Sequence, residues 1–463
     1  MRRSFEECRD AFMAARQSGN WADLVYWATE LIQYHDNLPW VWAIRGGALA
    51  KLGHPVDAIL NYDKALEFER GITAKALLYS NKGSAYWDMF ENDKALVNLN
   101  KALTLHKYPE TYMTLGHIYR YNGELDKAIE KYRQAVEITP DHADSHLSLG
   151  MTLLKAGQLE EGWKEYEWRW KSDQLPPRSF KYPHWKGEPL NNKSILVYEE
   201  QGLGDILQFC RYVRVLATKY PTAKIIVEGK PVVQRLLMTL QGAHKVINIG
   251  EDIPQVDYVI PMVSLAGILT PTKADIPAST NEFVIAQQDV IRWKRNFDKA
   301  NIPGKRIGLC WAGMSRTTQP HAAAVDALRS MELASMAPLA AVPGIFWISL
   351  QKGPPADQIK TPPRGMTIGD FTDEMHDFYE TCAAISNLDL VITVDTAVAH
   401  AAASIGKPTW MFSRWDGCWR WFGDGLRNPW YPSMLQFAQH KPRDWKDVVN
   451  VVARELADLV RKQ

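Results

Sequence analysis

The sequence predicts an α-helical solenoid followed by two α/β domains. Three observations support this fold class. Glycines recur at a common spacing in the first third of the chain, Gly19 to Gly53 and Gly123 to Gly157. From Ser194 onward, short apolar runs alternate with helical patterns, which is typical of parallel sheets. The segment 390–408 reads as a buried strand, a break at Asp395-Thr396 and an Ala-rich helix that ends at Gly406.

Several units of the first third match the tetratricopeptide template in phase. The best unit carries Tyr112, Leu115, Gly116, Tyr119, Gly123, Leu125, Ala128, Tyr132, Ala135 and Pro140. Its neighbours carry Trp42, Gly46, Ala58, Tyr62 and Ala65, then Tyr79, Gly83, Tyr86, Ala95 and Ala102, and finally Leu149, Gly150, Gly157 and Tyr166. Small residues let paired helices approach and aromatic residues fill the gaps between pairs. Residues 5–172 therefore resemble about five tetratricopeptide repeats.

Such a solenoid presents a concave surface, so we expect a protein or peptide partner on the repeat groove. A structural arm or a dimerisation surface remains the alternative. The net charge of +1 gives no reason to expect a nucleic-acid or membrane partner. The five cysteines lack metal-site spacing, and no long apolar segment predicts a membrane span. A cytoplasmic location is therefore expected.

The expected domains are the solenoid over 1–172, a proline-rich connector over 173–193, and two Rossmann-like domains over 194–300 and 301–463. Strands of the first are expected at 195–198, 224–227, 246–249 and 256–260, and those of the second at 306–311, 345–350, 390–394 and 409–412. Helices are expected at 205–219, 232–240, 331–341, 374–387, 397–405 and 444–460. Twin domains of this kind have a ligand cleft between them.

The break at Asp395-Thr396 predicts a phosphate-binding site. A strand that runs into a helix start offers backbone N–H groups and the positive end of the helix dipole. His400 lies about one helical turn further on, so it is expected at the same opening. A satisfied core histidine is the alternative.

A second loop, Glu199-Glu200-Gln201-Gly202-Leu203-Gly204-Asp205, closes the first strand of the first α/β domain. Gly202 and Gly204 permit a tight turn close to a ligand. Asp205 then lies in the first helical turn at the carboxyl edge of the sheet, where it could act as a general base on a hydroxyl. The alternative is an ordinary helix-capping aspartate.

These loops, together with S-L-Q-K-G-P (349–354), W-R-W (419–421) and P-W-Y-P (429–432), resemble the heptosyltransferase-like glycosyltransferases of GT-B fold. The order of motifs is similar to that of bacterial proteins that join tetratricopeptide repeats to such a domain. The resemblance covers nearly the whole chain. It implies a glycosyltransferase that uses a nucleotide-diphosphate sugar as co-substrate, needs no cofactor or metal, and modifies an acceptor recruited by the repeats.

The resemblance also implies roles for individual residues. Asp205 matches the general base, and Asp395 matches the aspartate at the donor sugar. The diphosphate would be held by Thr396 and Ala397, with His400 nearby and Arg329 and Ser330 facing the phosphates. Gln351 and Lys352 would belong to the nucleotide loop. Such an arrangement places a base on one side and positive charge for the leaving diphosphate on the other.

The sequence departs from the family pattern around Arg329. The usual D-R-x-R-S element reads Asp326-Ala327-Leu328-Arg329-Ser330 here, so one arginine is missing, and the preceding residues 319–325 are atypical. Cys418 replaces an aspartate expected before W-R-W, although Asp416 is close. The alternative function is therefore a glycosyltransferase-like scaffold that has lost turnover. A third possibility is a small-molecule or glycan acceptor, with the repeats serving oligomerisation.

Overall fold

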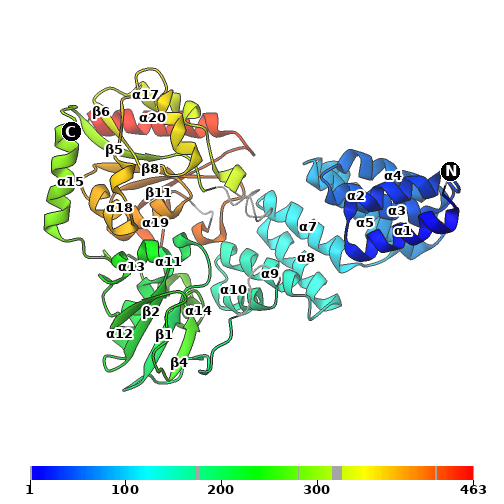
Figure 1. Ribbon diagram of the computed structural model, residues 1–463, viewed down its shortest axis with the longest axis horizontal. Helices are drawn as coiled ribbons and strands as arrows, with labels where there is room; N and C mark the ends of the chain where they lie inside the picture. Colours follow the sequence, from blue (N-terminus) through cyan, green and yellow to red (C-terminus); the bar gives the residue numbers. More distant parts are fainter. Residues whose placement is uncertain (1–2, 173–177, 280, 315–325, 423–424, 462–463) are drawn as a thin grey trace. The chain divides into compact units, whose positions relative to one another are not determined.

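The computed structural model describes residues 3–172, 178–279, 281–314, 326–422 and 425–461. The chain divides into two compact units, Met1–Thr152 and Leu153–Gln463. The first unit is helical, and the second contains two sheets. Figure 1 shows the first unit in blue to cyan and the strands of the second in green to orange.

The first unit consists of successive helix pairs. Its helices are α1 (Phe5–Ser18), α2 (Trp21–Ile32), α3 (Pro39–Lys51), α4 (Pro55–Phe68), α5 (Ile72–Asp88), α6 (Asn92–Leu105), α7 (Pro109–Tyr121) and α8 (Leu125–Ile138). A fifth pair follows, α9 (Ala143–Ala156) and α10 (Leu159–Tyr166), and the division between the units falls within α9. This N-terminal region is a helical repeat of the tetratricopeptide type, as the sequence predicts.

Glycines let the two helices of a pair approach closely. A Cβ added to Gly46 would lie 2.7 Å from the ring of Tyr62, and one added to Gly116 would lie 2.5 Å from the ring of Tyr132. In these two pairs a glycine of the first helix therefore packs against a tyrosine ring of the second. Because both rings are buried, any larger residue at these glycines would force a shift.

The turns between paired helices use left-handed backbone. Gly19, Gly53, Gly123 and Gly157 have φ values of 68°, 81°, 80° and 80°. Phe90 occupies the matching turn of the third pair with φ 59°. The third pair therefore lacks the turn glycine of the other pairs, because Phe90 adopts the left-handed conformation in its place.

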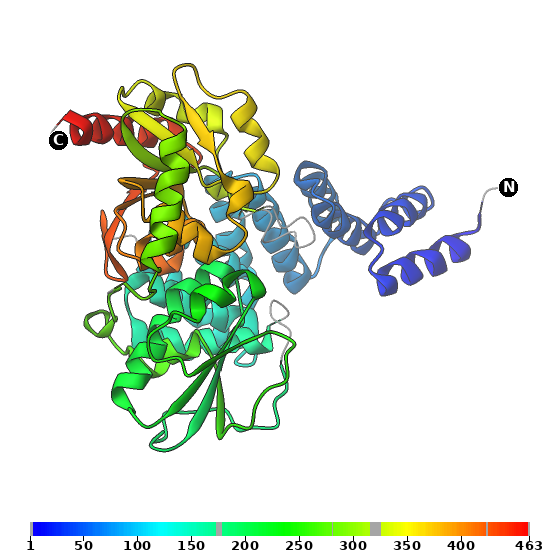
Figure 2. The same cartoon turned by 60° about the vertical axis from the view of Figure 1, so that its left-hand side comes forward.

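The first sheet of the second unit contains four parallel strands in the order β3-β2-β1-β4. They are β1 (Ser194–Tyr198), β2 (Lys224–Gly229), β3 (Lys245–Asn248) and β4 (Tyr258–Pro261). The helices of this part are α11 (Leu203–Phe209), α12 (Arg211–Lys219), α13 (Pro231–Leu237) and α14 (Ser264–Leu269). All four strands match the predicted positions within a few residues. In Figure 2 the green strands of this sheet are separate from the yellow-to-orange strands of the second.

The helix predicted at 205–219 is instead two helices, α11 and α12, that meet at Cys210. The Nε of Arg211 donates a 2.6 Å hydrogen bond to the carbonyl oxygen of Gln208. This bond occupies an acceptor of the last turn of α11, which is a known cause of a helix break. Periodicity alone does not reveal such a bond.

The second sheet contains seven strands in the order β10-β11-β9-β8-β5-β6-β7, and only β10 is antiparallel to its neighbour. The strands are β5 (Lys305–Cys310), β6 (Ile345–Ser349), β7 (Ile368–Asp370), β8 (Leu390–Val394), β9 (Thr409–Ser413), β10 (Arg427–Asn428) and β11 (Tyr431–Ala438). The sequence predicts β5, β6, β8 and β9 but misses the strands at both edges. The α/β region with parallel sheets is thus confirmed.

Helices cover both faces of this sheet. One core joins the sheet to α17 (Ala337–Ala340) and α20 (Trp445–Arg461). The other joins it to α15 (Gln287–Lys299), α18 (Phe378–Ile385) and α19 (Ala397–Ser404). Val449, Val452 and Leu456 of α20 are buried, so the C-terminal helix packs back onto the sheet as predicted. Helix α15 was not predicted.

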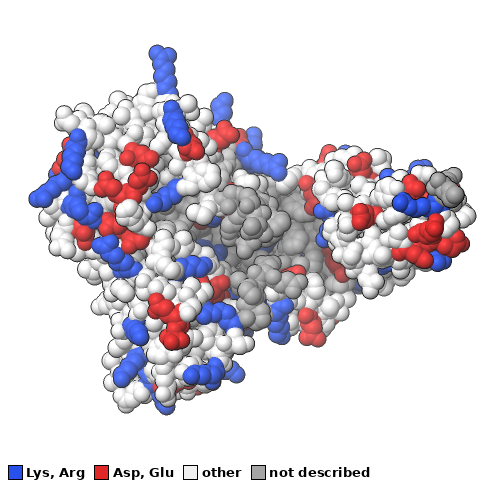
Figure 3. Space-filling view, in the orientation of Figure 1, with Lys and Arg blue, Asp and Glu red and all other residues white. Residues whose placement is uncertain are grey.

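The connector packs against the first sheet where it is described, from residue 178 onward. The backbone N–H of Trp185 donates to the carbonyl oxygen of Val259 in β4, and the indole ring is buried. Residues 173–177 of the predicted connector lie outside the described residues. Within the described ranges, no helix combines the length and the apolar character needed to cross a bilayer. On the face in Figure 3, basic and acidic side chains are interspersed, in keeping with the net charge of +1.

Candidate functional site

The two predicted motifs meet where the carboxyl ends of the two sheets come together. Gly204 lies at the start of α11, directly after β1, and His400 lies in α19, directly after β8. A Cβ added to Gly204 would lie 2.9 Å from Cδ2 of His400, so the two helices touch at this point. Figure 1 shows α11 beside α19. The predicted acceptor-side loop and the predicted phosphate turn therefore share one location.

Asp205 has both carboxylate oxygens engaged. Its Oδ2 accepts a 3.1 Å hydrogen bond from the backbone N–H of Gly202, which caps α11. Its Oδ1 forms an ion pair with the guanidinium of Arg420, from the W-R-W segment 215 residues further along the chain. Asp205 is thus a helix-capping residue, and its role as a general base stays a prediction.

Arg420 joins the two loops. Its Nη2 donates a 3.2 Å hydrogen bond to Oε1 of Gln201. Its Nη1 donates a 3.0 Å bond to Sγ of Cys418. Its guanidinium carbon lies 4.3 Å from the ring centre of Trp419. Burial opposes its charge, but Asp205 and then Cys418 hold the pKa of Arg420 well above its usual value. The side chain is a fixed positive charge at the seam between the sheets.

His400 is buried in the same seam. Its ring stacks on that of Trp421 at 5.0 Å, and its Nδ1 shares a 3.0 Å hydrogen bond with the hydroxyl of Tyr431. Burial first, and then the charges of Arg420, Arg211 and Arg329, lower the pKa of His400 well below its usual value. The imidazole is therefore uncharged at neutral pH. Its surroundings resemble those of a core histidine, although it lies within the site; its predicted role toward a donor stays a prediction.

The phosphate turn has the predicted strand-to-helix geometry. Asp395 and Thr396 follow β8, and Thr396 is the N-cap residue of α19, whose first residue is Ala397. The hydroxyl of Thr396 lies 3.3 Å from that of Thr393 and makes no capping bond to the helix. Backbone N–H groups of the helix start are thus not capped by the Thr396 side chain, as a site for an anion requires.

Arg329 and Ser330 lie against this turn. The Nη1 of Arg329 donates a 2.8 Å hydrogen bond to the carbonyl oxygen of Asp395, and the guanidinium also pairs with the buried Asp326. Ser330 Oγ accepts a 3.0 Å bond from the N–H of Gly313, beyond the end of β5. The R-S element therefore lies beside the start of α19, and its contact with donor phosphates stays a prediction. The atypical residues 319–325 lie outside the described residues.

Gln351 and Lys352 have different environments. Gln351 is buried, and its Oε1 accepts bonds from the backbone N–H groups of Trp311 and Ala312 at 3.1 and 2.8 Å. It braces the loop after β5 rather than opening toward solvent. Lys352 is exposed, and its Nζ donates to the carbonyl oxygen of Met375 at 2.6 Å.

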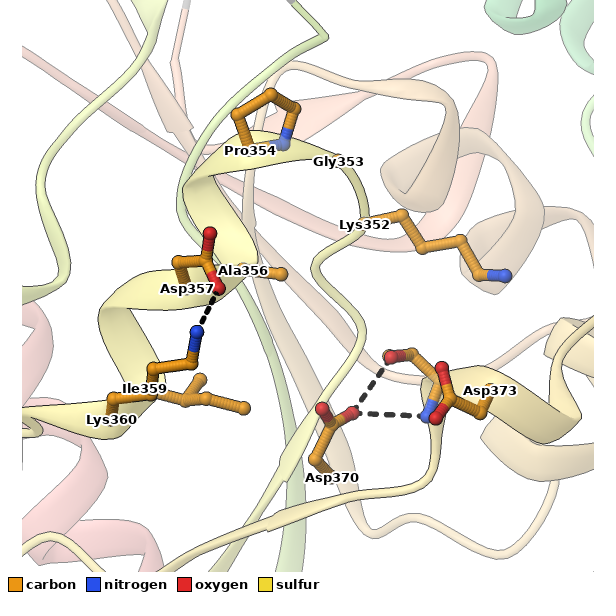
Figure 4. Close-up of a pocket in the computed structure, with 10 residues that line it drawn as sticks. Lys352, Gly353, Pro354, Ala356, Asp357, Ile359, Lys360, Asp370 and Asp373 are labelled. Atoms are coloured by element: carbon orange, nitrogen blue, oxygen red, sulfur yellow. Dashed lines mark hydrogen bonds and ion pairs between the residues drawn. The ribbon is translucent and has the colours of Figure 1, made fainter.

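Lys352 borders a hollow with a volume of about 600 Å³ at the β6–β7 end of the second sheet. Its charged lining residues are Lys352, Lys360, Asp357, Asp370 and Asp373. Figure 4 shows Lys352 and Asp373 on one side and the Asp357–Lys360 pair on the other. Asp370 accepts two hydrogen bonds from Thr372, at 3.0 and 2.8 Å. The hollow is polar and large enough for part of a nucleotide.

Sequence reasoning did not assign Arg420, Gln201 or Tyr431 to the site. The W-R-W segment that contains Arg420 entered only as part of the family resemblance, because its contact with Asp205 depends on how the two sheets pack. Trp419 and Trp421, on either side of Arg420, are both buried. Among the described residues, His, Cys, Asp and Glu form no group of three or more that could hold a metal ion. The metal-independent reaction stays a prediction.

Two family models match the repeat region: "TPR repeat" over residues 116–157 and "Tetratricopeptide repeat" over residues 76–106. The chain contains tetratricopeptide repeats. Protein FlbA of Caulobacter vibrioides is 24% identical over 450 residues, which cover 90% of this chain and 67% of FlbA. The BBSome complex member BBS4 of Bos taurus is 28% identical over 39% of this chain and 31% of its own length.

Solved structures match each part separately. A crystal structure of MamA is 25% identical, with a TM-score of 0.31, and covers 36% of this chain and 90% of MamA. The glycosyl transferase family 9 protein of Veillonella parvula is 10% identical, with a TM-score of 0.43, and covers 60% of this chain and 98% of its own.

Proposed function

We propose that the chain is a glycosyltransferase that moves a sugar from a nucleotide-diphosphate sugar to an acceptor hydroxyl. The observation that carries this proposal is the contact between Gly204 and His400. It brings a carboxylate loop after β1 and a helix start after β8 to one place. Open α/β sheets bind ligands at the carboxyl ends of their strands. The GT-B resemblance of the motifs supports the same assignment.

In the proposed reaction Asp205 accepts the proton of the acceptor hydroxyl. The acceptor oxygen forms a bond to the anomeric carbon of the donor, and the bond from that carbon to the diphosphate oxygen breaks. Asp395 would orient the sugar, while the start of α19 and Arg329 would receive the negative charge of the departing nucleoside diphosphate. The Arg329 guanidinium is held in place by the Asp326 carboxylate and the carbonyl oxygen of Asp395, so its charge is preorganised for this role.

The nucleoside end of the donor would extend toward Lys352. The hollow beside this lysine opens at the same edge of the second sheet as Gln351 and the loop after β5. Its mixture of lysines and aspartates suits the hydroxyls and ring nitrogens of a nucleoside better than an apolar ligand. We further propose that the repeats recruit the acceptor, as a protein or peptide in their groove.

Release of nucleoside diphosphate from a panel of sugar nucleotides tests the proposal. The wild type should release nucleotide from at least one donor, and Asp205→Ala should slow this by about a hundredfold or more, the usual contribution of a general base. Asp275→Ala is a matched control because Asp275 caps the short helical turn Lys273–Asp275 through the N–H of Thr272, as Asp205 caps α11 through Gly202. If no donor binds or turns over, the enzyme assignment is wrong.

A scaffold without turnover is the second candidate, and one observation favours it. Both charged groups of the proposed site already have protein partners, Asp205 with Arg420 and Arg329 with Asp326. A scaffold would bind its protein partner equally well before and after Asp205→Ala and would release no nucleotide. Pull-down of a partner by both proteins, combined with absent turnover in the wild type, would favour this function.

A further inference from the structure

We propose that the last helical repeat is built into the site, and that Tyr166 at the end of α10 positions Arg420 against Asp205 through the side chain of Gln201. This inference rests on the proposed function where it calls Asp205 the base. It gives the final repeat a task besides recruitment. The four residues belong to the same compact unit.

A continuous set of hydrogen bonds connects them. Nε2 of Gln201 donates to the hydroxyl of Tyr166 at 3.0 Å, and Oε1 of Gln201 accepts from Nη2 of Arg420 at 3.2 Å. The same Nη2 pairs with Oδ1 of Asp205. The Tyr166 hydroxyl also lies 3.4 Å from Oε1 of Gln201. An amide side chain has one donor end and one acceptor end, so the shorter bond from Nε2 to Tyr166 turns Oε1 toward Arg420.

Packing holds the rest of the last repeat against both loops. Trp419, next to Arg420, lies 5.2 Å from the ring of Tyr166 and 5.5 Å from that of Trp163, measured between ring centres. Nζ of Lys155, in the last turn of α9, donates to the carbonyl oxygens of Asp416 and Gly417 at 2.5 and 3.3 Å. The segment that carries Arg420 is thus covered by the repeat.

A buried ion pair attaches the repeat to the acceptor-side loop as well. Arg169 lies in the 3-10 helix Glu167–Lys171 that follows α10, and its Nε and Nη2 bond to Glu200 at 2.6 and 3.1 Å. Both side chains are almost fully buried. Ser264 accepts a further 2.7 Å bond from Arg169. Glu200 precedes Gln201 directly, so this pair fixes the backbone from which Gln201 reaches Arg420.

Tyr166 acts at a distance from the reacting atoms, so it is a positioning residue. Arg420 occupies one oxygen of Asp205, and the Gly202 N–H occupies the other. The orientation of the guanidinium decides which lone pair of the carboxylate remains for an acceptor hydroxyl. A looser Arg420 should therefore lower kcat without changing the KM for the donor, which binds on the opposite wall.

Cys418 provides a probe that needs no enzymatic activity. Its Sγ lies 3.0 Å from Nη1 of Arg420, and it is half-buried, whereas the other four cysteines are buried. The rate at which iodoacetamide alkylates Cys418 in the full-length protein, followed by peptide mass spectrometry, therefore reports on the position of Arg420. Arg420→Lys keeps the charge but loses the guanidinium donors, so it shows whether the alkylation rate of Cys418 rises or falls when this contact is lost.

Tyr166→Phe should change the Cys418 alkylation rate in the same direction as Arg420→Lys, by about two- to tenfold, as expected for one lost hydrogen bond. Gln201→Leu should do the same, and the double variant should match Gln201→Leu because both changes break one connection. Tyr132→Phe is the matched control, since it loses a comparable 2.8 Å bond to His117 within the repeats. Its alkylation rate should equal that of the wild type.

Three results would overturn the inference: an unchanged rate in Tyr166→Phe, independent effects of Tyr166→Phe and Gln201→Leu that multiply in the double variant, or an unchanged rate in Arg420→Lys. Turnover assays on the same variants separate this inference from the proposed function. If no donor is turned over, the glycosyltransferase assignment fails, whereas the thiol measurements still decide whether Tyr166 positions Arg420.

Discussion

His400 lies on Trp421 and beside Gly204, where a charged imidazole would have no water around it. Its pKa is lowered by burial and by three arginines, so the folded protein excludes the proton that the unfolded chain takes up below about pH 6.5. The unfolded state therefore binds more protons in acid. The free energy of unfolding must therefore fall as the pH drops below the pKa of this histidine in the unfolded chain.

We predict that the free energy of unfolding of the second unit decreases by about 1.4 kcal/mol per pH unit below about pH 6.5 on account of His400 alone. His400→Gln should be less stable than the wild type at pH 7.5 because it loses the ring stacking on Trp421. The difference should shrink at pH 5.5. Urea unfolding at both pH values measures this, and a constant difference between the two proteins would contradict the assignment.

At the scale of single residues, short-range rules for strand ends and helix starts singled out Asp205 and Asp395, whereas Arg329 was selected only through the family resemblance; their chemical roles stay predictions. The sequence did not assign Arg420, which reaches Asp205 across 215 positions in the chain. Gln351 is the opposite case. The sequence assigned it to the nucleotide loop, but its side chain is buried and accepts a hydrogen bond from the backbone after β5. Contacts between distant segments depend on how the sheets pack, and one sequence does not reveal that packing.

At the scale of elements, the glycines of the repeats have distinct physical tasks. Gly46 faces Tyr62 across a helix pair, and a Cβ added to Gly46 would lie 2.7 Å from the tyrosine ring. A Cβ added to the adjacent Gly47 would lie 4.0 Å from its nearest neighbour, the hydroxyl of the same tyrosine. Both glycines lie in α3. They therefore form a matched pair within one helix, one crowded and one with ordinary room.

Gly46→Ala should lower the free energy of unfolding of the repeat unit by about 1–3 kcal/mol, because the methyl group overpacks the buried ring of Tyr62. Gly47→Ala should raise it by up to about 1 kcal/mol through the better helix propensity of alanine. Thermal or urea unfolding followed at 222 nm compares the two. Equal effects of the same sign would show that the close approach of α3 and α4 is absent.

Elements with a clear internal pattern were predictable, and elements defined by their neighbours were not. The strands β1, β6 and β8 are mostly runs of apolar residues, and the sequence locates them. Strand β7 at one edge of the sheet and strand β11, next to the other edge, have no such run; β11 begins with Tyr431-Pro432-Ser433 and pairs through its backbone with β10 and β9. The break between α11 and α12 follows from the side chain of Arg211.

At the scale of the second unit, an ion-pair cluster joins helices of its two sheets. Glu380 of α18 bonds to Arg235 of α13 at 2.6 Å and to Arg292 of α15 at 2.5 Å, and it accepts a 2.7 Å bond from the indole of Trp293. Burial works against the Glu380 charge, but these three bonds hold its pKa below the usual value. The cluster therefore stabilises the packing of the two sheets on which the site depends.

Glu380→Gln should lower the free energy of unfolding of this unit by about 1–3 kcal/mol at pH 7, since two arginines lose their shared carboxylate. The loss should vanish in acid. A carboxylate whose pKa is lowered by folding stabilises the fold at pH values above its pKa in the unfolded chain, and this stabilisation disappears once the carboxylate is protonated. Asp458→Asn, which removes an exposed partner of Arg461, is the control and should change the unfolding midpoint little. Equal losses in both variants would contradict a role in joining the sheets.

The proposed site has two walls, the Asp205 loop for the acceptor and the Asp395–Ala397 turn with Arg329 for the donor. Calorimetric titration with the nucleoside diphosphate of the active donor, in parallel with turnover, tests it most directly. Arg329→Gln should weaken nucleotide binding by about ten- to a hundredfold, as expected for a lost charged hydrogen bond. Arg306→Gln is the control, because Arg306 pairs with Asp298 near the opposite end of β5.

Asp205→Asn should retain nucleotide affinity and lose turnover. Equal weakening of binding by Asp205→Asn and Arg329→Gln, or unchanged binding in Arg329→Gln, would contradict the two-walled site.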